Sequence, residues 1–276
     1  MPDPSTPAAP TITAMMLVRD RADLLEAAMR SVLAQTERDL ELVVFDDGSR
    51  DDSRAVAERV AARDARVRVL GVEAGASLGI PAARNRVVAA ARGRYLAVCD
   101  SDDLSRPERF AAQRALLDTN ARLAGVGARF STFHGHAPRP TNSPAAAESL
   151  DHEPGWHWGL RDGRLPFLFP TAMLRLESVR AVDGFDPSYA LAEDLHLCYR
   201  LAAAGGRFAS VDAVLVDYRI HDGSITQSRA RAREWHNLRA QLAGIALLRG
   251  RFSVRGWAVL AQSLARTLLA SAGLRR

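Results

Sequence analysis

The stretch Tyr95-Leu96-Ala97-Val98-Cys99-Asp100-Ser101-Asp102-Asp103 decides how this chain is interpreted. Its first five residues form a short apolar run, which predicts a buried strand, and its last four include three carboxylates. Acids this close together repel one another unless a cation or hydrogen-bond donors offset their charge. Such oxygen ligands suit Mg²⁺ or Mn²⁺. Capping of the helix that follows, by Asp103 or Ser105 ahead of Pro107, would explain only one of these residues.

A second apolar run ends in acids in the same way. Leu40–Phe45 predicts a strand that leads directly into the turn Asp46-Asp47-Gly48-Ser49. Asp-Gly is also an ordinary turn signal, so this motif gains weight from the hydrophobic strand before it. Ligands of parallel α/β sheets bind beyond the carboxyl ends of the strands. Two acidic strand ends therefore predict a ligand site at one edge of the sheet.

Strands and helices alternate through the first half of the chain. The predicted strands are Thr11–Val18, Leu40–Phe45, Arg66–Gly71 and Tyr95–Cys99. The predicted helices are Leu24–Ala34, a helix capped by Asp52 or Ser53 that runs to about Arg63, Pro81–Arg92 and Pro107–Asp118. This order predicts an α/β fold with a mainly parallel sheet and helices on both faces.

The second half of the chain is less regular. An apolar stretch at Leu123–Phe133 is followed by a long segment rich in Pro, His, Gly and Trp, His134–Leu165, which predicts a loop or lid. Order returns at Phe167–Leu174. Helices are then predicted at Leu176–Val182 and Glu193–Ala204, and a last strand at Ala213–Ile220, directly before His221.

Composition limits the classes of protein and partner. The 276 residues are 47% hydrophobic and 25% charged, which is typical of a globular protein with one large domain, or with one domain and a helical appendage. Residues 229–276 carry ten arginines and one acid, whereas residues 1–228 carry 31 acids and 27 arginines. This asymmetry argues against a nucleic-acid-binding core and predicts a basic tail that faces something anionic.

Cysteine usage and the ends of the chain predict a cytoplasmic protein. Cys99 and Cys198 lie in apolar surroundings without metal-ligand spacing, as expected of buried, reduced thiols. Residues 1–10 are rich in Pro, Ala and Ser, which predicts disorder, and they lack the apolar run of a signal peptide. No stretch approaches the length of a membrane-spanning helix.

Three further groups could carry chemistry, each with a plainer alternative. Arg84, in the segment that opens a predicted helix, could face an anion or could be a solvated surface arginine. Glu193 and Asp194 could only complement a helix dipole, or one of them could deprotonate a hydroxyl. His221, taken alone, has no assigned role.

Together these segments closely resemble the family 2 glycosyltransferases with a GT-A fold. The resemblance covers about residues 11–226 and rests on seven segments in the family's order. They are Ser31–Thr36, Leu40–Ser49, Ala83-Arg84-Asn85, Gly93-Arg94-Tyr95 before Asp100–Asp103, Gly184-Phe185-Asp186, Glu193-Asp194 and Tyr218–His221. The resemblance implies one mixed Rossmann-like sheet flanked by helices, with a helical extension at the C-terminus.

The resemblance also implies roles for individual residues. Asp47 would contact the nucleotide base with Asp46 nearby, Arg84 would help to hold the nucleotide, and Asp100 would lie near the ribose. Asp102 would bind the metal, Mn²⁺ or Mg²⁺, and His221 matches a position that in some members binds the metal or the diphosphate. Asp194 would be the general base in an inverting displacement.

This chain departs from the family where its first strand ends. The family usually places an aromatic or small polar residue and then asparagine there, and this chain has Arg19-Asp20. Arg19 would then lie near the base or the phosphates. UDP is the preferred nucleotide, with GDP and dTDP open. The processive-synthase signature Gln-x-x-Arg-Trp is absent, which favours a single addition.

The resemblance divides the chain into two halves and a tail. Residues 11–125 would form the nucleotide-sugar half and residues 126–228 the acceptor half, where Glu193, Trp156 and Trp158 are acceptor candidates. The acceptor would be a carbohydrate or a lipid-linked sugar in cell-surface polysaccharide or glycolipid synthesis. Residues 229–276 would pack on the catalytic domain, form a homodimer contact or bind the inner membrane face. A sugar nucleotidyltransferase and a non-catalytic nucleotide-sugar-binding relative are the rival interpretations.

Overall fold

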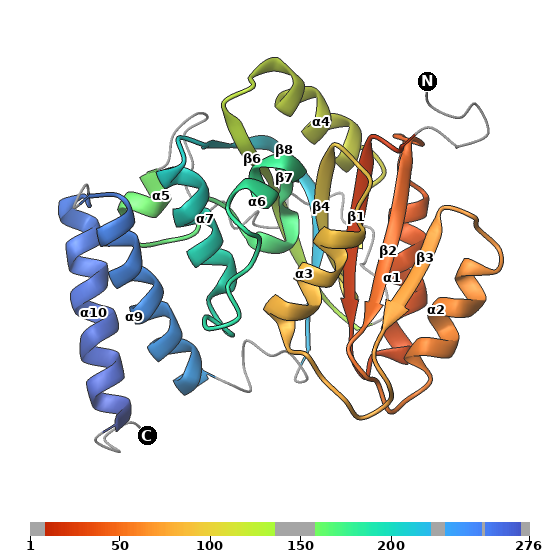
Figure 1. Ribbon diagram of the computed structural model, residues 1–276, viewed down its shortest axis with the longest axis horizontal. Helices are drawn as coiled ribbons and strands as arrows, with labels where there is room; N and C mark the ends of the chain where they lie inside the picture. The colour runs from red at the N-terminus through yellow and green to blue at the C-terminus, as the bar shows by residue number, and fades with distance from the viewer. Residues whose placement is uncertain (1–8, 136–157, 222–229, 250–251, 272–276) are drawn as a thin grey trace.

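The computed structural model describes residues 9–135, 158–221, 230–249 and 252–271 (Figure 1). Within these residues, eight strands form a single sheet in the order β3-β2-β1-β4-β7-β6-β8-β5. The strands are β1 (Ile12–Val18), β2 (Leu40–Asp46), β3 (Val67–Gly71), β4 (Tyr95–Asp100), β5 (Leu104–Ser105), β6 (Leu123–His134), β7 (Met173–Arg175) and β8 (Arg207–Ile220). The sheet is mixed, because β1–β4 are parallel whereas β7 is antiparallel to β4 and β6.

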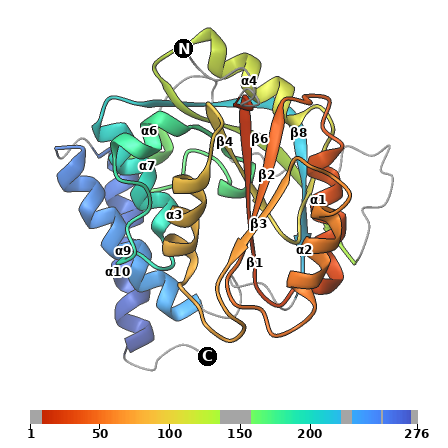
Figure 2. The same cartoon turned by 45° about the vertical axis from the view of Figure 1, so that its right-hand side comes forward.

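Helices cover both faces of the sheet (Figure 2). They are α1 (Ala22–Leu33), α2 (Ser53–Ala61), α3 (Ile80–Ala90), α4 (Arg109–Thr119), α5 (Trp158–Arg161), α6 (Leu176–Ala181), α7 (Glu193–Ala203), α9 (Ala230–Leu247) and α10 (Val254–Ser271), with a 3₁₀ turn at Phe169–Thr171. The α/β class and the flanking helices predicted from the sequence are confirmed.

The two faces of the sheet build two hydrophobic cores, because successive side chains of a strand point to opposite faces. In β1, Met15 packs with α3, α6 and α7, whereas its neighbours Ala14 and Met16 pack with α1, α2 and α4. β1 lies between β2 and β4, and both of its faces are covered, so it reads as a continuous apolar run. The parallel strands β1, β2 and β4 therefore carry the loops at their carboxyl ends on a rigid, buried base.

Several element boundaries differ from those predicted. β8 begins at Arg207 rather than Ala213. Its first seven residues mix apolar and polar side chains without clear alternation, and their strand conformation comes from pairing with β6. The two-residue strand β5 is too short to give a pattern, and α5 lies within the predicted loop. Asp52 occupies the N-cap position of α2 without a side-chain cap hydrogen bond, and Asp51 Oδ1 accepts the Ser53 amide instead at 2.9 Å.

The C-terminal extension is helical as predicted. α9 packs along α7, and α10 packs on α9 as the outermost helix (Figure 1). The approach of α9 to α7 is close at Gly244, where an added Cβ would lie 2.4 Å from the Tyr199 ring. Across the described segments, we find no helix with the length and apolar character needed to cross a bilayer.

Candidate active site

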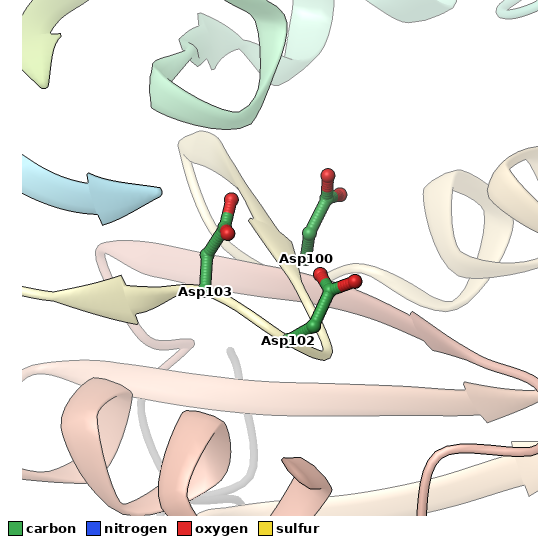
Figure 3. Close-up of side chains that lie close together, drawn as sticks. All are labelled: Asp100, Asp102 and Asp103. Atoms are coloured by element: carbon green, nitrogen blue, oxygen red, sulfur yellow. The ribbon is translucent and has the colours of Figure 1, made fainter. Parts of the chain in front are cut away.

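Three aspartates meet on the turn that joins β4 to β5. Asp100 ends β4, and Asp102 and Asp103 follow in the turn. One carboxylate oxygen from each lies within 4.8 Å of those of the other two, and Figure 3 shows the three carboxyl groups projecting from the turn in the same general direction. The predicted acidic cluster is therefore one site in three dimensions.

The negative charges of this acidic turn are not fully offset by protein groups. Burial and the neighbouring charge of Asp102 together raise the pKa of Asp100 to about 6, although Arg84 lowers it. Burial also raises the pKa of Asp103 well above its ordinary value, and Asp100 and Asp102 add to this shift. Asp103 Oδ2 is buried and accepts no hydrogen bond from the described residues. A buried carboxylate oxygen without a donor is an unusual arrangement that a cation would satisfy.

Asp103 does not cap a helix, so the capping alternative for this residue is wrong. α4 begins after Glu108, and no side chain caps it. Asp103 Oδ1 instead accepts the Arg219 amide of β8 at 2.8 Å, and Arg219 Nε donates to the carbonyl oxygen of Asp102 at 2.6 Å. β8 therefore fixes the conformation of the acidic turn. The three clustered carboxylates, one of them with an unpartnered oxygen, fit a hard divalent cation such as Mg²⁺ or Mn²⁺.

Asp102 and His221 come together although they are 119 positions apart in the sequence. His221 Nε2 lies 2.9 Å from Asp102 Oδ2, and Arg21 Nε lies 3.9 Å from the same oxygen. Sequence reasoning paired the first two as metal or diphosphate ligands but did not consider Arg21. The position of Arg21 in the loop after β1, two residues beyond Arg19, could have identified it as a site residue.

The second acidic turn organises the loop that leads into α3. Asp47 Oδ1 accepts the Leu78 amide at 2.7 Å, and Oδ2 accepts the Ser77 hydroxyl at 2.6 Å. Asp46 is buried and accepts the Ser49 amide at 3.0 Å, so it shapes its own turn. Only glycine fits at position 48, where φ is +76° and a Cβ would lie 1.9 Å from a carbonyl oxygen of the loop.

Arg19 lies at the carboxyl end of β1, beside the second acidic turn. Its Nη1 is 3.9 Å from Asp47 Oδ2, and its side chain is half-exposed. The next residue, Asp20, has a positive φ of 53° and accepts the Arg50 amide through Oδ1 at 2.7 Å. The loops after β1 and β2 are thus joined, and Arg19 is presented at their surface.

Arg84 is buried, so the alternative of a solvated surface arginine is wrong. Its Nη1 lies 2.8 Å from Glu193 Oε1, and its guanidinium lies 4.9 Å and 5.2 Å from the ring centroids of Phe169 and Phe185. Burial raises the pKa of Glu193 to about 7, although Arg84 lowers it. This ion pair joins α3 to the N-terminus of α7.

Asp194 lies next to Glu193 in the first turn of α7. Its charge is one of those that raise the pKa of Asp100, so the N-terminus of α7 shares the electrostatic field of the acidic turn. The carboxylate of Asp194 is therefore near enough to Asp100 for its charge to act on that residue. Trp156 lies outside the described residues, and Trp158 begins α5 with its side chain outside them.

Comparisons with known proteins point to one family. Residues 13–177 match the family model described as Glycosyl transferase family 2. The chain is 30% identical over 240 residues to the succinoglycan biosynthesis protein ExoO of Rhizobium meliloti, which covers 82% of this chain and 66% of that protein. It is 31% identical over 215 residues to ExoU of the same organism, covering 74% and 60%. The chain thus spans less than two thirds of the length of these curated relatives.

Solved structures show the same fold at low sequence identity. TarS 1-349 of S. aureus in complex with UDP-GlcNAc aligns with a TM-score of 0.69 at 17% identity, over 93% of this chain and 72% of that one. The mannosyltransferase PcManGT from Pyrobaculum calidifontis, in complex with GDP-Man and Mn²⁺, aligns with a TM-score of 0.67 at 19% identity, over 100% and 78%. The GT-A fold expected from the sequence is confirmed.

Proposed function

Because this chain belongs to glycosyl transferase family 2, we propose that it transfers a sugar from a nucleoside-diphosphate sugar to an acceptor hydroxyl with inversion at the anomeric carbon. One observation carries the proposal. The acidic turn has His221 at 2.9 Å from Asp102, and the charge of Asp194 acts on Asp100. These contacts support a proposal in which Asp102 and His221 bind a diphosphate-bound cation and Asp194 accepts a proton at the same edge of the sheet.

The donor nucleotide is proposed to bind over the carboxyl ends of β1, β2 and β4. Asp47 contacts the base and Asp46 holds the turn that presents it, while Asp100 lies near the ribose. Arg19, half-exposed beside Asp47, faces the base or the phosphates. Arg84, which is positioned by its ion pair with Glu193, helps to hold the nucleotide.

Asp102 and His221 are the proposed ligands of Mn²⁺ or Mg²⁺. A cation there supplies positive charge against the charge that develops on the departing diphosphate. Two observations support a cation at this site. Asp103 has a buried oxygen without a partner among the described residues, and burial together with Asp102 raises the pKa of Asp100.

Asp194 is proposed to take the proton from the acceptor hydroxyl. The hydroxyl oxygen then forms a bond to the anomeric carbon from the face opposite the nucleotide. The bond between that carbon and the diphosphate oxygen breaks, and its electron pair leaves with the nucleoside diphosphate. The products are a glycoside of inverted configuration, the nucleoside diphosphate and a proton on Asp194.

Exchanging Asp194 for asparagine tests this step, because the amide keeps the shape of the side chain but cannot accept the proton. Transfer should fall to background while the affinity for nucleoside diphosphate stays within about threefold of the parent. Transfer at a near-parental rate would show that another group is the base. Release of pyrophosphate from a nucleoside triphosphate and a sugar 1-phosphate would instead identify the rival nucleotidyltransferase.

UDP is the proposed donor nucleotide. TarS binds UDP-GlcNAc and PcManGT binds GDP-Man, so solved structures of this fold accept both uridine and guanosine donors. Thermal unfolding with UDP, GDP or dTDP, each with Mn²⁺, would discriminate between them, because a ligand that binds only the folded state raises the melting temperature. We expect UDP to give the largest shift. The donor proposal fails if none of the three raises the melting temperature.

The acceptor is proposed to be a carbohydrate or lipid-linked sugar in polysaccharide synthesis, as the names of ExoO and ExoU suggest. Residues 11–125 would hold the donor and residues 126–228 the acceptor, with Glu193, Trp156 and Trp158 as acceptor candidates. The reaction is proposed to take place in the cytoplasm. Both cysteines are free and buried, which is consistent with a reducing compartment.

A further inference from the structure

The outermost helix, α10, presents an apolar stripe to solvent. Val254, Trp257 and Leu264 have exposed fractions of 89%, 49% and 48%, and Ala261 between them is also exposed. These four positions follow one another at intervals of three, four and three residues, so they lie on one face of the helix. Single exposed apolar residues are common on protein surfaces, but an aligned stripe that includes a tryptophan marks a contact surface.

The neighbouring helix α9 has the same character. Trp235 and Leu242 are each 52% exposed, and Ala246, four residues further on, is also exposed. The opposite side of α9 is already used, because Ala240, Gln241 and Gly244 are buried in the hairpin and against the domain. Among the described residues, the exposed stripes of both helices therefore remain uncovered by the packing between the extension and the domain.

Charge indicates what covers this surface. Residues 229–276 carry ten arginines and one acid, Glu234. The side chains of Arg255 and Arg266 on α10 are 67% and 51% accessible, although Arg255 Nε lies 3.9 Å from Asp162 Oδ2 and Arg266 Nη1 lies 3.7 Å from Glu234 Oε1. Exposed ion pairs of this kind are weak, so both arginines can also meet another anion. A second copy of the chain would bring the same arginines with almost no acids to meet them, so charge opposes that pairing. A surface that is both apolar and anionic complements exposed tryptophan, leucine and arginine together.

We propose that the α9–α10 hairpin, residues 230–271, is a docking surface for an anionic lipid membrane. Trp257 and Leu264 enter the boundary between headgroups and acyl chains, and Arg255 and Arg266 contact lipid phosphates. Neither helix crosses the bilayer, because neither is long and apolar enough to do so. This attachment is independent of the sugar-transfer chemistry, since no residue of the acidic turn takes part in it.

Vesicle flotation of the full chain tests the docking surface without any assay of activity. The probes are vesicles of equal parts phosphatidylglycerol and phosphatidylcholine, and vesicles of phosphatidylcholine alone. We expect binding to the first at low salt, loss of that binding at high salt, and little binding to the second. Absence of the parent chain from the anionic vesicles at low salt would overturn the proposal.

Two variants and a matched control locate the contact on α10. Trp257→Glu with Leu264→Glu should weaken binding to anionic vesicles about tenfold or more, as should Arg255→Glu with Arg266→Glu. Arg59→Glu with Arg63→Glu changes two exposed arginines at the end of α2 and just after it, by the same total charge as the arginine variant on α10, and should leave binding unchanged. Equal losses in the control and the arginine variant would overturn the proposal, because net charge alone would then explain binding.

Light scattering coupled to gel filtration tests whether a second copy of the chain, rather than a membrane, covers the hairpin. If the parent is a dimer that Trp257→Glu with Leu264→Glu converts to a monomer, and the parent does not float with vesicles, the surface belongs to a second copy and the proposal is wrong. Circular dichroism of each variant identifies any that fails to fold. If a variant fails to fold, Trp235→Glu on α9 is measured in its place, and the same loss of vesicle binding is expected.

Discussion

Replacing Glu41 with glutamine tests how the sheet that carries the site is held together. Glu41 is buried in β2, and its two carboxylate oxygens accept hydrogen bonds from Thr13 Oγ1 at 2.8 Å, the Arg92 amide and Nε at 2.9 Å each, and Arg68 Nη1 at 3.0 Å. A glutamine keeps one oxygen and turns an amide group toward donors. Two charge-assisted hydrogen bonds are then lost, at roughly 1.5 kcal/mol each, so the free energy of unfolding should fall by about 3 kcal/mol at pH 7.

The loss should depend on pH in a defined direction. Burial raises the pKa of Glu41, but the hydrogen bonds from Arg92, Thr13 and Arg68 outweigh burial and lower the pKa below its ordinary value of 4.5. A lowered pKa in the folded state contributes stability that is present above pH 4.5 and is lost as the pH falls through the folded value. A protonated Glu41 resembles glutamine, so the difference between parent and variant should shrink under acid conditions.

Urea unfolding at neutral and acid pH measures both effects. The matched control is Glu58→Gln, which removes an exposed ion pair with Arg54 on α2 (Nε to Oε1, 2.9 Å). Exposed pairs of this kind contribute about 0.5 kcal/mol or less. If the glutamine variants at positions 41 and 58 lose equal stability at pH 7, or if the loss at position 41 grows on acidification, the reasoning is refuted.

Three further outcomes are expected. Gly48→Ala places a Cβ 1.9 Å from a backbone carbonyl oxygen and should cost about 3 kcal/mol in urea unfolding, whereas Gly79→Ala, with a similar positive φ but open space, should cost about 1 kcal/mol. Gly244→Ala brings a Cβ to 2.4 Å from the Tyr199 ring and should lower the melting temperature by several degrees, unlike a surface substitution on α10. Asp102→Ala should abolish the Mn²⁺-dependent part of nucleoside diphosphate binding in calorimetry, and unchanged Mn²⁺ dependence would contradict its role as a ligand.

Much of the fold could be predicted because the central strands are buried on both sides. β1, β2 and β4 are mostly apolar, interrupted only by Thr13 in β1 and Glu41 in β2 before the acids that end β2 and β4, and β2 and β4 run directly into turns rich in Asp and Ser. The first half of β8, residues 207–213, could not be predicted, because its side chains show no clear alternation and its strand conformation comes from pairing with β6. The same applies to β5, which exists only through its pairing with β8.

Within the candidate site, acids were easier to predict than their partners. Asp47 and Asp102 were identified because they follow apolar strands, and strand ends are where ligands bind. The contact between Arg84 and Glu193 joins segments 109 positions apart, and no local pattern encodes it. Arg21 and Arg219 were missed for the same reason, since arginines are frequent in this chain and only the tertiary structure shows which of them face the acidic turn.

The direct packing of α9 on α7 gives the extension a geometrical consequence. Helix α7, which carries Asp194 in its first turn, and the hairpin proposed to rest on lipid pack directly on one another, in contact at Gly244 and Tyr199. A bilayer that holds α10 would therefore set the height of Asp194 above the headgroups. An acceptor anchored in that bilayer would reach the acid only if its glycan spans this height. The packed helices α7, α9 and α10 would then select acceptors by the length of the glycan that these acceptors already carry.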